Sequence, residues 1–219
     1  MSGATLRGAT PAGRVALTFD AEHPDRPTST GVAERLLELL DRLAVPATFF
    51  VQGRWAEAYP ATARRIVQAG HAVGSHSFYH ARLPLFSDAG LDVDLGEAER
   101  VLCEIVGVDP RPWFRCPFGE GDDDVRVLAA LDRLGYANVG WDVAAEDWDP
   151  RRTVEQVEAA VTAGASAHGD GTVVLLHAWP DRTLAAIPGI VARLRDAGAD
   201  LIRINALDRL PTTGPRCPA

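Results

Sequence analysis

The feature that most constrains the fold of this chain is the alternation of two kinds of segment along its length. Short runs rich in apolar β-branched and aromatic residues are separated by longer runs whose apolar residues recur at helical spacing. Seven of the short runs have the length and composition of strands: 14–20, 46–52, 71–76, 112–116, 136–142, 172–178 and 200–204. Because strands that alternate with helices form parallel sheets, the sequence predicts a parallel α/β fold.

Capping signals mark the ends of several predicted helices. Pro60 stands near the start of one helix and Gly70 follows its end. Ser87 is a candidate for the first residue of another. The acidic run 122–124 has the composition of a metal cluster, but negative charge also stabilises a helix N-terminus. We therefore interpret this run as the cap of a helix that starts near Val125.

Length and composition predict one domain. The chain has 219 residues, of which 47% are hydrophobic, and this is enough for one sizeable core. We expect this single domain to span residues 14–210. The segments 1–13 and 211–219 are rich in Gly, Pro, Ala or Thr and are expected to be flexible tails.

The charge and the apolar runs argue against two classes of partner. A net charge of −8 disfavours general binding to nucleic acids or anionic membranes. No window approaches 18 continuous apolar residues, so we expect no membrane span. The first 14 residues lack the apolar core of a signal peptide, and we expect a cytoplasmic protein unless an export signal has been removed. The three cysteines form no CxxC pair, which favours reduced thiols.

Ionisable residues gather where the predicted strands end. Five of the seven strands carry such residues at or just beyond their carboxyl ends: Asp20 and Glu22; His76 and His80; Arg115; Asp142, Glu146 and Asp147; and His177. Parallel barrels place their active sites at the carboxyl ends of the strands. We therefore expect these side chains to converge on one mouth.

The two histidines after the third strand form a candidate metal site. His76 and His80 are four residues apart, and one helical turn would place both imidazoles on the same face. Two unrelated histidines on a polar loop would show the same spacing, so the pair alone is not decisive. A carboxylate from another strand end would complete a set of two histidines and one carboxylate, which is common in catalytic metal sites.

Five motifs in fixed order resemble the polysaccharide deacetylases, carbohydrate esterase family four, whose domain is also called the NodB homology domain. The matching residues are Thr18-Phe19-Asp20, His76-Ser77-Phe78-Tyr79-His80, Arg115-Cys116-Pro117-Phe118-Gly119, Asp147-Trp148 and Leu176-His177. The resemblance covers roughly residues 14–205. It implies a distorted (β/α) barrel of about seven parallel strands, and a metal-dependent hydrolase that removes acetyl groups from N-acetylated amino sugars or polysaccharides.

The resemblance also implies a role for the matched acids and bases. Asp20 would be the general base that activates water, and Arg115 would orient it. His177 would be the general acid that protonates the leaving amine, and Asp147 would support its imidazole. Amide hydrolysis needs such a base and a separate acid, and each typically contributes about 10²- to 10⁴-fold.

The first motif departs from the family pattern at the metal site. The position of the usual second aspartate is Ala21, which cannot coordinate an ion. We predict that Glu22, one residue later and one methylene longer, joins His76 and His80 as a ligand, and His23 is the alternative. Two imidazoles and one carboxylate favour zinc, with cobalt or nickel as other candidates.

We expect the substrate to bind next to these catalytic and metal-site residues. The candidate substrate-binding residues are Pro117, Phe118, Gly119, Trp148 and Trp179. By the resemblance, Trp148 would form a wall of the acetyl pocket, and the backbone N–H of Phe118 would help to stabilise the oxyanion. Trp179 stands beside His177 and is a candidate contact to the substrate.

Two other functions stay open at this stage. The chain could hydrolyse another non-peptide C–N bond in a small cytoplasmic molecule. Alternatively, Ala21 could mark a lost metal site, which would leave a carbohydrate-binding protein without catalysis. The leading expectation is that the binding partner is an N-acetylated carbohydrate substrate. The sequence does not determine the oligomeric state.

Overall fold

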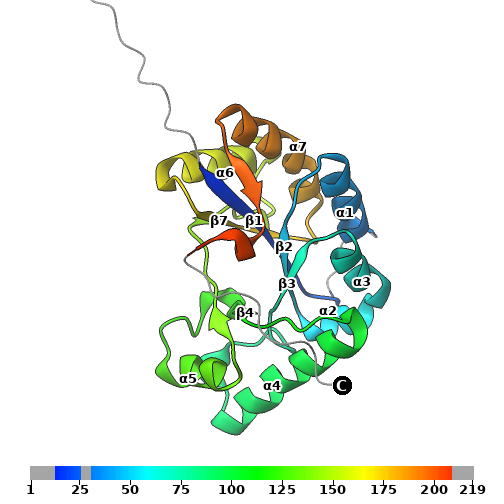
Figure 1. The fold of residues 1–219 in the computed structure, drawn as a ribbon, viewed down its shortest axis with the longest axis vertical. Coiled ribbons are helices and arrows are strands. Elements are labelled where there is room, and N and C mark those ends of the chain that lie inside the picture. Colours follow the sequence, from blue (N-terminus) through cyan, green and yellow to red (C-terminus); the bar gives the residue numbers. More distant parts are fainter. Residues whose placement is uncertain (1–12, 26–30, 209–219) are drawn as a thin grey trace, which may run out of the picture.

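The computed structural model describes residues 13–25 and 31–208 of the chain, and its centre is one parallel sheet. The strands run in the order β5-β4-β3-β2-β1-β7-β6, and β8 pairs with β1 (Figure 1). Their bounds are β1 Arg14–Ala21, β2 Thr48–Val51, β3 Ala72–Ser75, β4 Trp113–Phe114, β5 Ala137–Asn138, β6 Val143–Ala144, β7 Thr172–His177 and β8 Asp200–Ile202. Every strand pairing is parallel, which confirms the predicted fold class.

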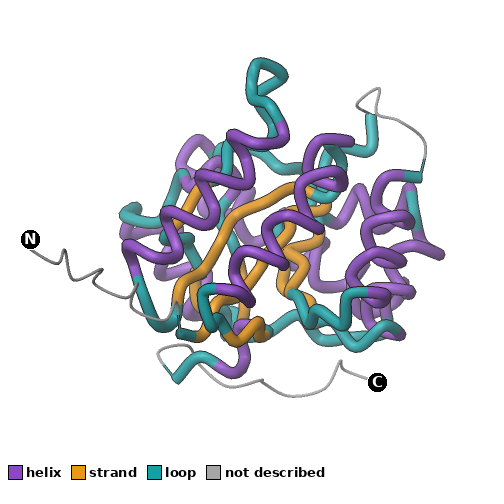
Figure 2. Tube along the Cα trace, turned by 90° about the horizontal axis from the view of Figure 1, so that it is seen from above, coloured by secondary structure: helices purple, strands orange, loops and turns teal. Residues whose placement is uncertain are grey.

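Helices surround this sheet, as Figure 2 shows for the strands enclosed between helical segments. The α-helices are α1 Val32–Arg42, α2 Gly53–Ala58, α3 Pro60–Gln68, α4 Asp88–Val101, α5 Val125–Arg133, α6 Val154–His168 and α7 Asp181–Asp196. A π-helical turn, Leu102–Val106, extends α4, and 3₁₀ turns occur at Leu83–Leu85, Pro117–Gly119 and Ile204–Ala206. The short helix α2 and the π-helical turn were not predicted from the sequence.

The barrel is distorted because the sheet does not close within the described residues. Of the predicted strand 136–142, only Ala137–Asn138 is a strand, and the next short strand, Val143–Ala144, begins just after the run and lies at the opposite end of the strand order. Ala137–Asn138 pairs with β4, whereas Val143–Ala144 pairs with β7. The chain therefore crosses the gap between the two ends of the sheet, and Trp141 lies on this crossing.

Alternation along β1 decides which residues reach the interior of the barrel. Val15, Leu17, Phe19 and Ala21 belong to the largest hydrophobic cluster, which includes residues of α1, α3, α6 and α7. Ala16 instead belongs to a second cluster with residues of neighbouring strands. Because successive side chains of a strand point to opposite faces, Asp20 shares the interior side with Ala16.

The predicted helix caps are observed. The Asp124 carboxylate accepts hydrogen bonds from the backbone N–H groups of Arg126 and Val127, at 2.9 and 3.2 Å. The hydroxyl of Ser87 accepts one from Gly90 N–H at 3.1 Å. The acidic run before α5 thus caps a helix, as interpreted from the sequence.

Three remaining expectations concern the tails, the membrane and the cysteines. The predicted flexible tails, 1–13 and 211–219, lie outside the described residues except for Gly13. None of the described helices has the length and apolar character needed to cross a bilayer. Cys116 is a free, buried thiol, whereas Cys103 is disulfide-bonded, so the expectation of reduced thiols is wrong for Cys103.

Candidate active site

A pocket of about 440 Å³ lies where the strands end, and most of the predicted site residues line it. The predicted residues in its wall are Asp20, Glu22, His76, His80, Phe118, Trp148, His177 and Trp179. Asp20 and His177 are paired in register across β1 and β7, which explains how residues so far apart in the chain meet. The convergence expected from the strand ends is therefore observed, except for Asp142, which does not line the pocket and whose carboxylate accepts a hydrogen bond of 2.8 Å from Val173 N–H near the start of β7.

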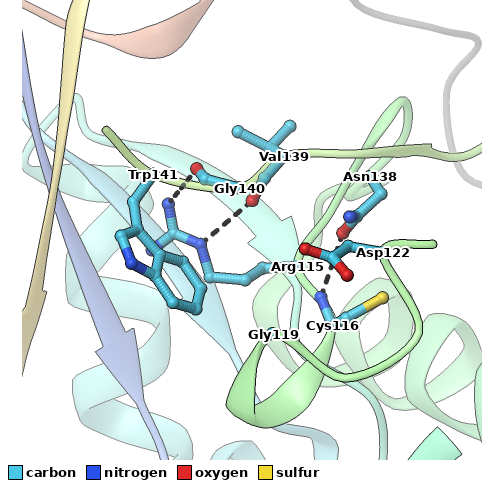
Figure 3. A pocket seen from close by; sticks show the side chains of 8 residues that line it. All are labelled: Arg115, Cys116, Gly119, Asp122, Asn138, Val139, Gly140 and Trp141. Atoms are coloured by element: carbon cyan, nitrogen blue, oxygen red, sulfur yellow. Dashed lines mark hydrogen bonds between the residues drawn. The ribbon is translucent and has the colours of Figure 1, made fainter. Parts of the chain in front are cut away.

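Arg115 holds Asp20 from inside the barrel. Its Nη1 donates a hydrogen bond of 2.8 Å to Asp20 Oδ1, and both side chains are buried. The other guanidinium nitrogens donate to the backbone carbonyls of Val139 and Gly140, at 3.1 and 3.2 Å (Figure 3). The ring of Phe50 lies 4.0 Å from the guanidinium carbon. These bonds fix Arg115, and the paired guanidinium balances and orients the Asp20 carboxylate.

His177 is held by Asp147 on the other side of the pocket. Asp147 Oδ1 lies 2.7 Å from His177 Nδ1, and Asp147 Oδ2 accepts a hydrogen bond of 2.7 Å from the His177 backbone N–H. Burial opposes protonation of the imidazole, but the Asp147 carboxylate outweighs it and raises the pKa of His177 to about 9. With Nδ1 committed to Asp147, Nε2 is the nitrogen free to exchange a proton with a ligand.

The hydroxyl of Thr183 completes this arrangement, and sequence reasoning missed it. It donates a hydrogen bond of 2.5 Å to Asp147 Oδ2, which is fully buried. Thr183 lies in α7, 36 residues beyond Asp147. A Thr in the first turn of a helix carries no sequence signal for such a contact, so only the packing of α7 could reveal it.

Glu22, His76 and His80 form the candidate metal site. One potential ligand atom from each residue lies within 4.8 Å of the others, and all three residues are buried. Glu22 Oε2 lies 3.3 Å from His76 Nε2 and contacts His80 Nε2. Burial opposes ionisation of Glu22, but its contacts with His23, His76 and His80 hold its pKa well below the usual range.

The hydrogen bonding of His76 tests whether a cation fits here. Its Nδ1 lies 2.8 Å from the carbonyl oxygen of Arg115, which makes Nδ1 the protonated nitrogen. The other nitrogen, Nε2, is buried without a hydrogen-bond partner among the described residues, 3.5 Å from Asp20 Oδ2 and 3.3 Å from Glu22 Oε2. A lone pair that faces two carboxylates calls for a positive charge, so these residues fit a divalent cation.

The loop that carries the two histidines is not helical, contrary to the sequence argument. His76 directly follows β3, and both Ser77 and His80 have left-handed backbone angles, with φ of 60° and 57°. The imidazole rings nevertheless lie 4.8 Å apart. A tight loop, and not a helical turn, brings the two rings together, so the helical geometry expected from the spacing is wrong.

A buried carboxylate from α4 supports this loop. Asp94 is 1% exposed and accepts hydrogen bonds from the backbone N–H groups of Phe78 and Tyr79, at 3.1 and 3.0 Å. Ser77 closes the loop from within, since its hydroxyl accepts a bond of 2.8 Å from His80 N–H. Nothing in the local sequence distinguishes Asp94 from the other acidic residues of α4, so its role was not foreseen.

The third motif contributes unequally to the pocket. Phe118 is half exposed with φ of 60°, and its ring lies 4.5 Å from that of His80. Pro117 is buried in the 3₁₀ turn and does not line the pocket. Gly119 lines a smaller neighbouring pocket of about 240 Å³, and Figure 3 shows the residues that line it. Trp141, missed as a site residue, borders both pockets.

Two other residues with ionisable side chains, His71 and Cys116, have structural roles away from the candidate metal site. His71 is buried at the start of β3, where it accepts a bond of 3.2 Å from Ala47 N–H, and burial lowers its pKa to about 4. Cys116 packs in a hydrophobic cluster, and burial raises the pKa of its thiol to about 12. A thiol that stays protonated is not a nucleophile.

The chain matches known proteins over most of the region that builds this site. A family model described as polysaccharide deacetylase matches residues 7–139. A peptidoglycan N-acetylglucosamine deacetylase of Listeria monocytogenes is 31% identical over 194 residues, which cover 89% of this chain but only 38% of that protein. A chitooligosaccharide deacetylase of Sinorhizobium fredii is 31% identical over 205 residues, which cover 88% of this chain and 90% of that protein.

Solved structures agree with these matches. A family 4 carbohydrate esterase from Streptomyces lividans, in complex with acetate, has a TM-score of 0.75 and 32% identity and covers 85% of this chain and 90% of its own. A pseudoenzyme of carbohydrate esterase family 4 from Bacillus anthracis has a TM-score of 0.79 and 26% identity, over 90% of this chain and 66% of its own. Similar folds therefore occur with and without catalysis.

Proposed function

Because this chain belongs to the polysaccharide deacetylase family, we propose that it is a metal-dependent hydrolase that removes the N-acetyl group from an N-acetylated amino sugar or its oligomers and releases acetate. The observation that carries this proposal is the convergence of three parts on one pocket. These parts are the Asp20–Arg115 pair, the His177–Asp147 pair and the Glu22–His76–His80 cluster.

The two pairs would divide the proton transfers between them. Asp20, held by Arg115, would take the proton from the attacking water. His177, held by Asp147, would donate a proton from Nε2 to the nitrogen of the leaving amino sugar. A pKa of about 9 keeps most of the imidazole protonated at neutral pH, as a general acid requires.

Glu22, His76 and His80 would hold a divalent ion. When bound, such an ion polarises the acetyl carbonyl and acidifies water. Two imidazoles and one carboxylate suit zinc best, and cobalt or nickel are compatible with the same ligands. In this variant of the first motif, Ala21 stands at the position of the usual second aspartate, and Glu22 would take over its role as a ligand. The burial of Ala21 in the main hydrophobic cluster supports this assignment.

The acetyl group and the sugar would lie against the aromatic wall of the pocket. Phe118, Trp148 and Trp179 line the same pocket as His177, and both Phe118 and Trp148 are about half exposed. Exposed aromatic rings offer the apolar faces on which sugar rings and methyl groups pack. The backbone N–H of Phe118 would contribute to oxyanion stabilisation.

A screen for acetate release tests this function. The protein would be loaded with zinc and assayed with N-acetylglucosamine, its oligomers and peptidoglycan fragments. We expect acetate from at least one of them, and a loss of about 10²- to 10⁴-fold in kcat with either Asp20→Asn or His177→Ala. A matched control is His168→Ala, because His168 lies at the end of α6 and does not line the pocket.

Two outcomes would contradict the proposal. The first is acetate release that Asp20→Asn and His177→Ala leave unchanged. The second is a zinc-loaded protein that binds the sugars without releasing acetate, which would favour the non-catalytic alternative.

A further inference from the structure

The two carboxylate oxygens of Glu22 lie in different surroundings. Oε2 faces the two metal-site histidines, His76 and His80. Oε1 points the other way and accepts a hydrogen bond of 3.2 Å from the indole Nε1–H of Trp179. His23 Nε2 also lies 3.0 Å from Oε1. The carboxylate is therefore held in one orientation.

We propose that Trp179 is a positioning residue for Glu22, which it orients so that Oε2 alone is presented to the cation; this inference rests on the metal site of the proposed function. An indole nitrogen can only donate, so it marks Oε1 as the oxygen that stays outside the ligand set. Partners of this kind orient ligands and tune metal affinity.

The replacement of an aspartate by a longer side chain explains why such a partner is needed. Glu22 has one more rotatable bond than an aspartate, so ordering its side chain costs more rotamer entropy. Ala21, the residue at the usual ligand position, is fully buried in the hydrophobic cluster and cannot assist. The bond to Trp179 restricts Glu22 before any ion arrives.

Trp179 is itself fixed relative to β1, as a positioning residue must be. The preceding residue, Ala178, donates a backbone hydrogen bond of 3.0 Å to the carbonyl of Asp20. The indole ring packs at 5.8 Å from the ring of His177 and at 6.4 Å from that of His23. The segment after β7 is thereby tied to the segment after β1, which carries Glu22.

His23 is anchored in a comparable way. Its backbone N–H donates a bond of 2.9 Å to Oε1 of Gln52, which is 2% exposed. Its φ of 57° turns the chain so that the imidazole returns toward Glu22. Two donors thus converge on Oε1, and Trp179 is the one that cannot serve as a metal ligand.

The positioning role differs in its consequences from a role as a substrate contact. A substrate contact would change KM and leave metal affinity unaltered. A positioning residue would change the affinity of the protein for the ion even when no substrate is present. Trp179→Phe separates the two, because it keeps an aromatic ring and removes the N–H donor.

The test is a zinc titration of metal-free protein against a chromophoric chelator. We expect Trp179→Phe to weaken zinc binding by about 10- to 100-fold. Trp148→Phe is the matched control, since Trp148 lines the same pocket but is not a hydrogen-bond partner of Glu22 among the described residues. The zinc affinity of this variant should equal that of the wild type. Circular dichroism of the metal-free proteins checks that each variant is folded.

A second variant keeps the test decisive if Trp179→Phe perturbs the fold. In a Glu22→Gln background, the substitution of Trp179 should cause little further loss of zinc affinity, because the two residues act through one hydrogen bond. Equal zinc affinity of wild type and Trp179→Phe overturns this inference but leaves the proposed function intact. Failure of the wild type to bind any divalent ion overturns both.

Discussion

The contact with Asp147 sets the pH range over which the His177 imidazole is protonated. If His177 acts as general acid, activity requires its protonated form, which is present below the raised pKa of about 9 and lost as the pH rises through it. In Asp147→Asn the burial of His177 remains while the favourable charge is gone, so its pKa falls. We expect kcat to decrease and its basic limb to move to lower pH, as measured by acetate release across a pH series.

A nearby carboxylate provides the control for this prediction. Asp149 lies two residues further on and binds Arg151 at 2.7 Å, outside the pocket. Asp149→Asn should leave the basic limb where it is in the wild type. A basic limb that stays in place in Asp147→Asn would show that His177 is not the titrating acid.

At the scale of elements, α4 determines the shape of the loop that carries the metal-site histidines. Asp94→Ala removes the acceptor from the buried N–H group of Phe78 and the partly buried one of Tyr79. Each unsatisfied group costs about 1–3 kcal/mol. We therefore expect a lower free energy of unfolding in urea, together with weaker zinc binding, because the loop relaxes and His80 moves.

A second aspartate on the same helix separates this effect from a general loss of charge. Asp92 pairs with Arg133 on the surface, where both side chains are about half exposed. Such pairs contribute about 0–1 kcal/mol, so Asp92→Ala should have little effect on stability and none on zinc binding. Equal losses in the two variants would refute the special role of Asp94.

Elements with a strong local signal could be predicted from the sequence, and those defined by closure of the sheet could not. The runs 46–52 and 172–178 appear as β2 and β7, because continuous apolar residues suit strands buried on both faces. The run 136–142 has the same composition, yet only Ala137–Asn138 in it is a strand, and the chain leaves the run for β6 at the opposite end of the sheet. Local composition carries no information on where the sheet stays open.

The same distinction applies to the candidate site. Asp20 and His177 were predictable because strand ends place them, and the third-motif Arg115 was predictable from the resemblance. The bond between Trp179 and Glu22 joins residues 157 positions apart, and that between Asp94 and the histidine loop depends on how α4 packs. Contacts of this kind follow from tertiary packing and leave no pattern in the sequence.

For the whole molecule, the proposed metal site would couple ion binding to stability. Zinc at about 100 times its dissociation constant should stabilise the folded protein by about 2.7 kcal/mol, because the unfolded chain cannot assemble the site. We expect a higher Tm with zinc and a lower one after chelation. In Glu22→Gln this shift should be much smaller, and a shift of full size would exclude Glu22 as a ligand.

The pairing of β1 with β7 determines when, during synthesis of the chain, the candidate site can assemble. Asp20 leaves the ribosome early in synthesis, whereas its register partner His177 and the neighbouring Trp179 follow only after most of the domain has been translated. Until β7 docks beside β1, the nascent chain has the candidate metal-site histidines but neither the proposed acid nor the residue proposed to orient Glu22. A chain truncated before this point would lack half of the candidate active site, however well its first half folds.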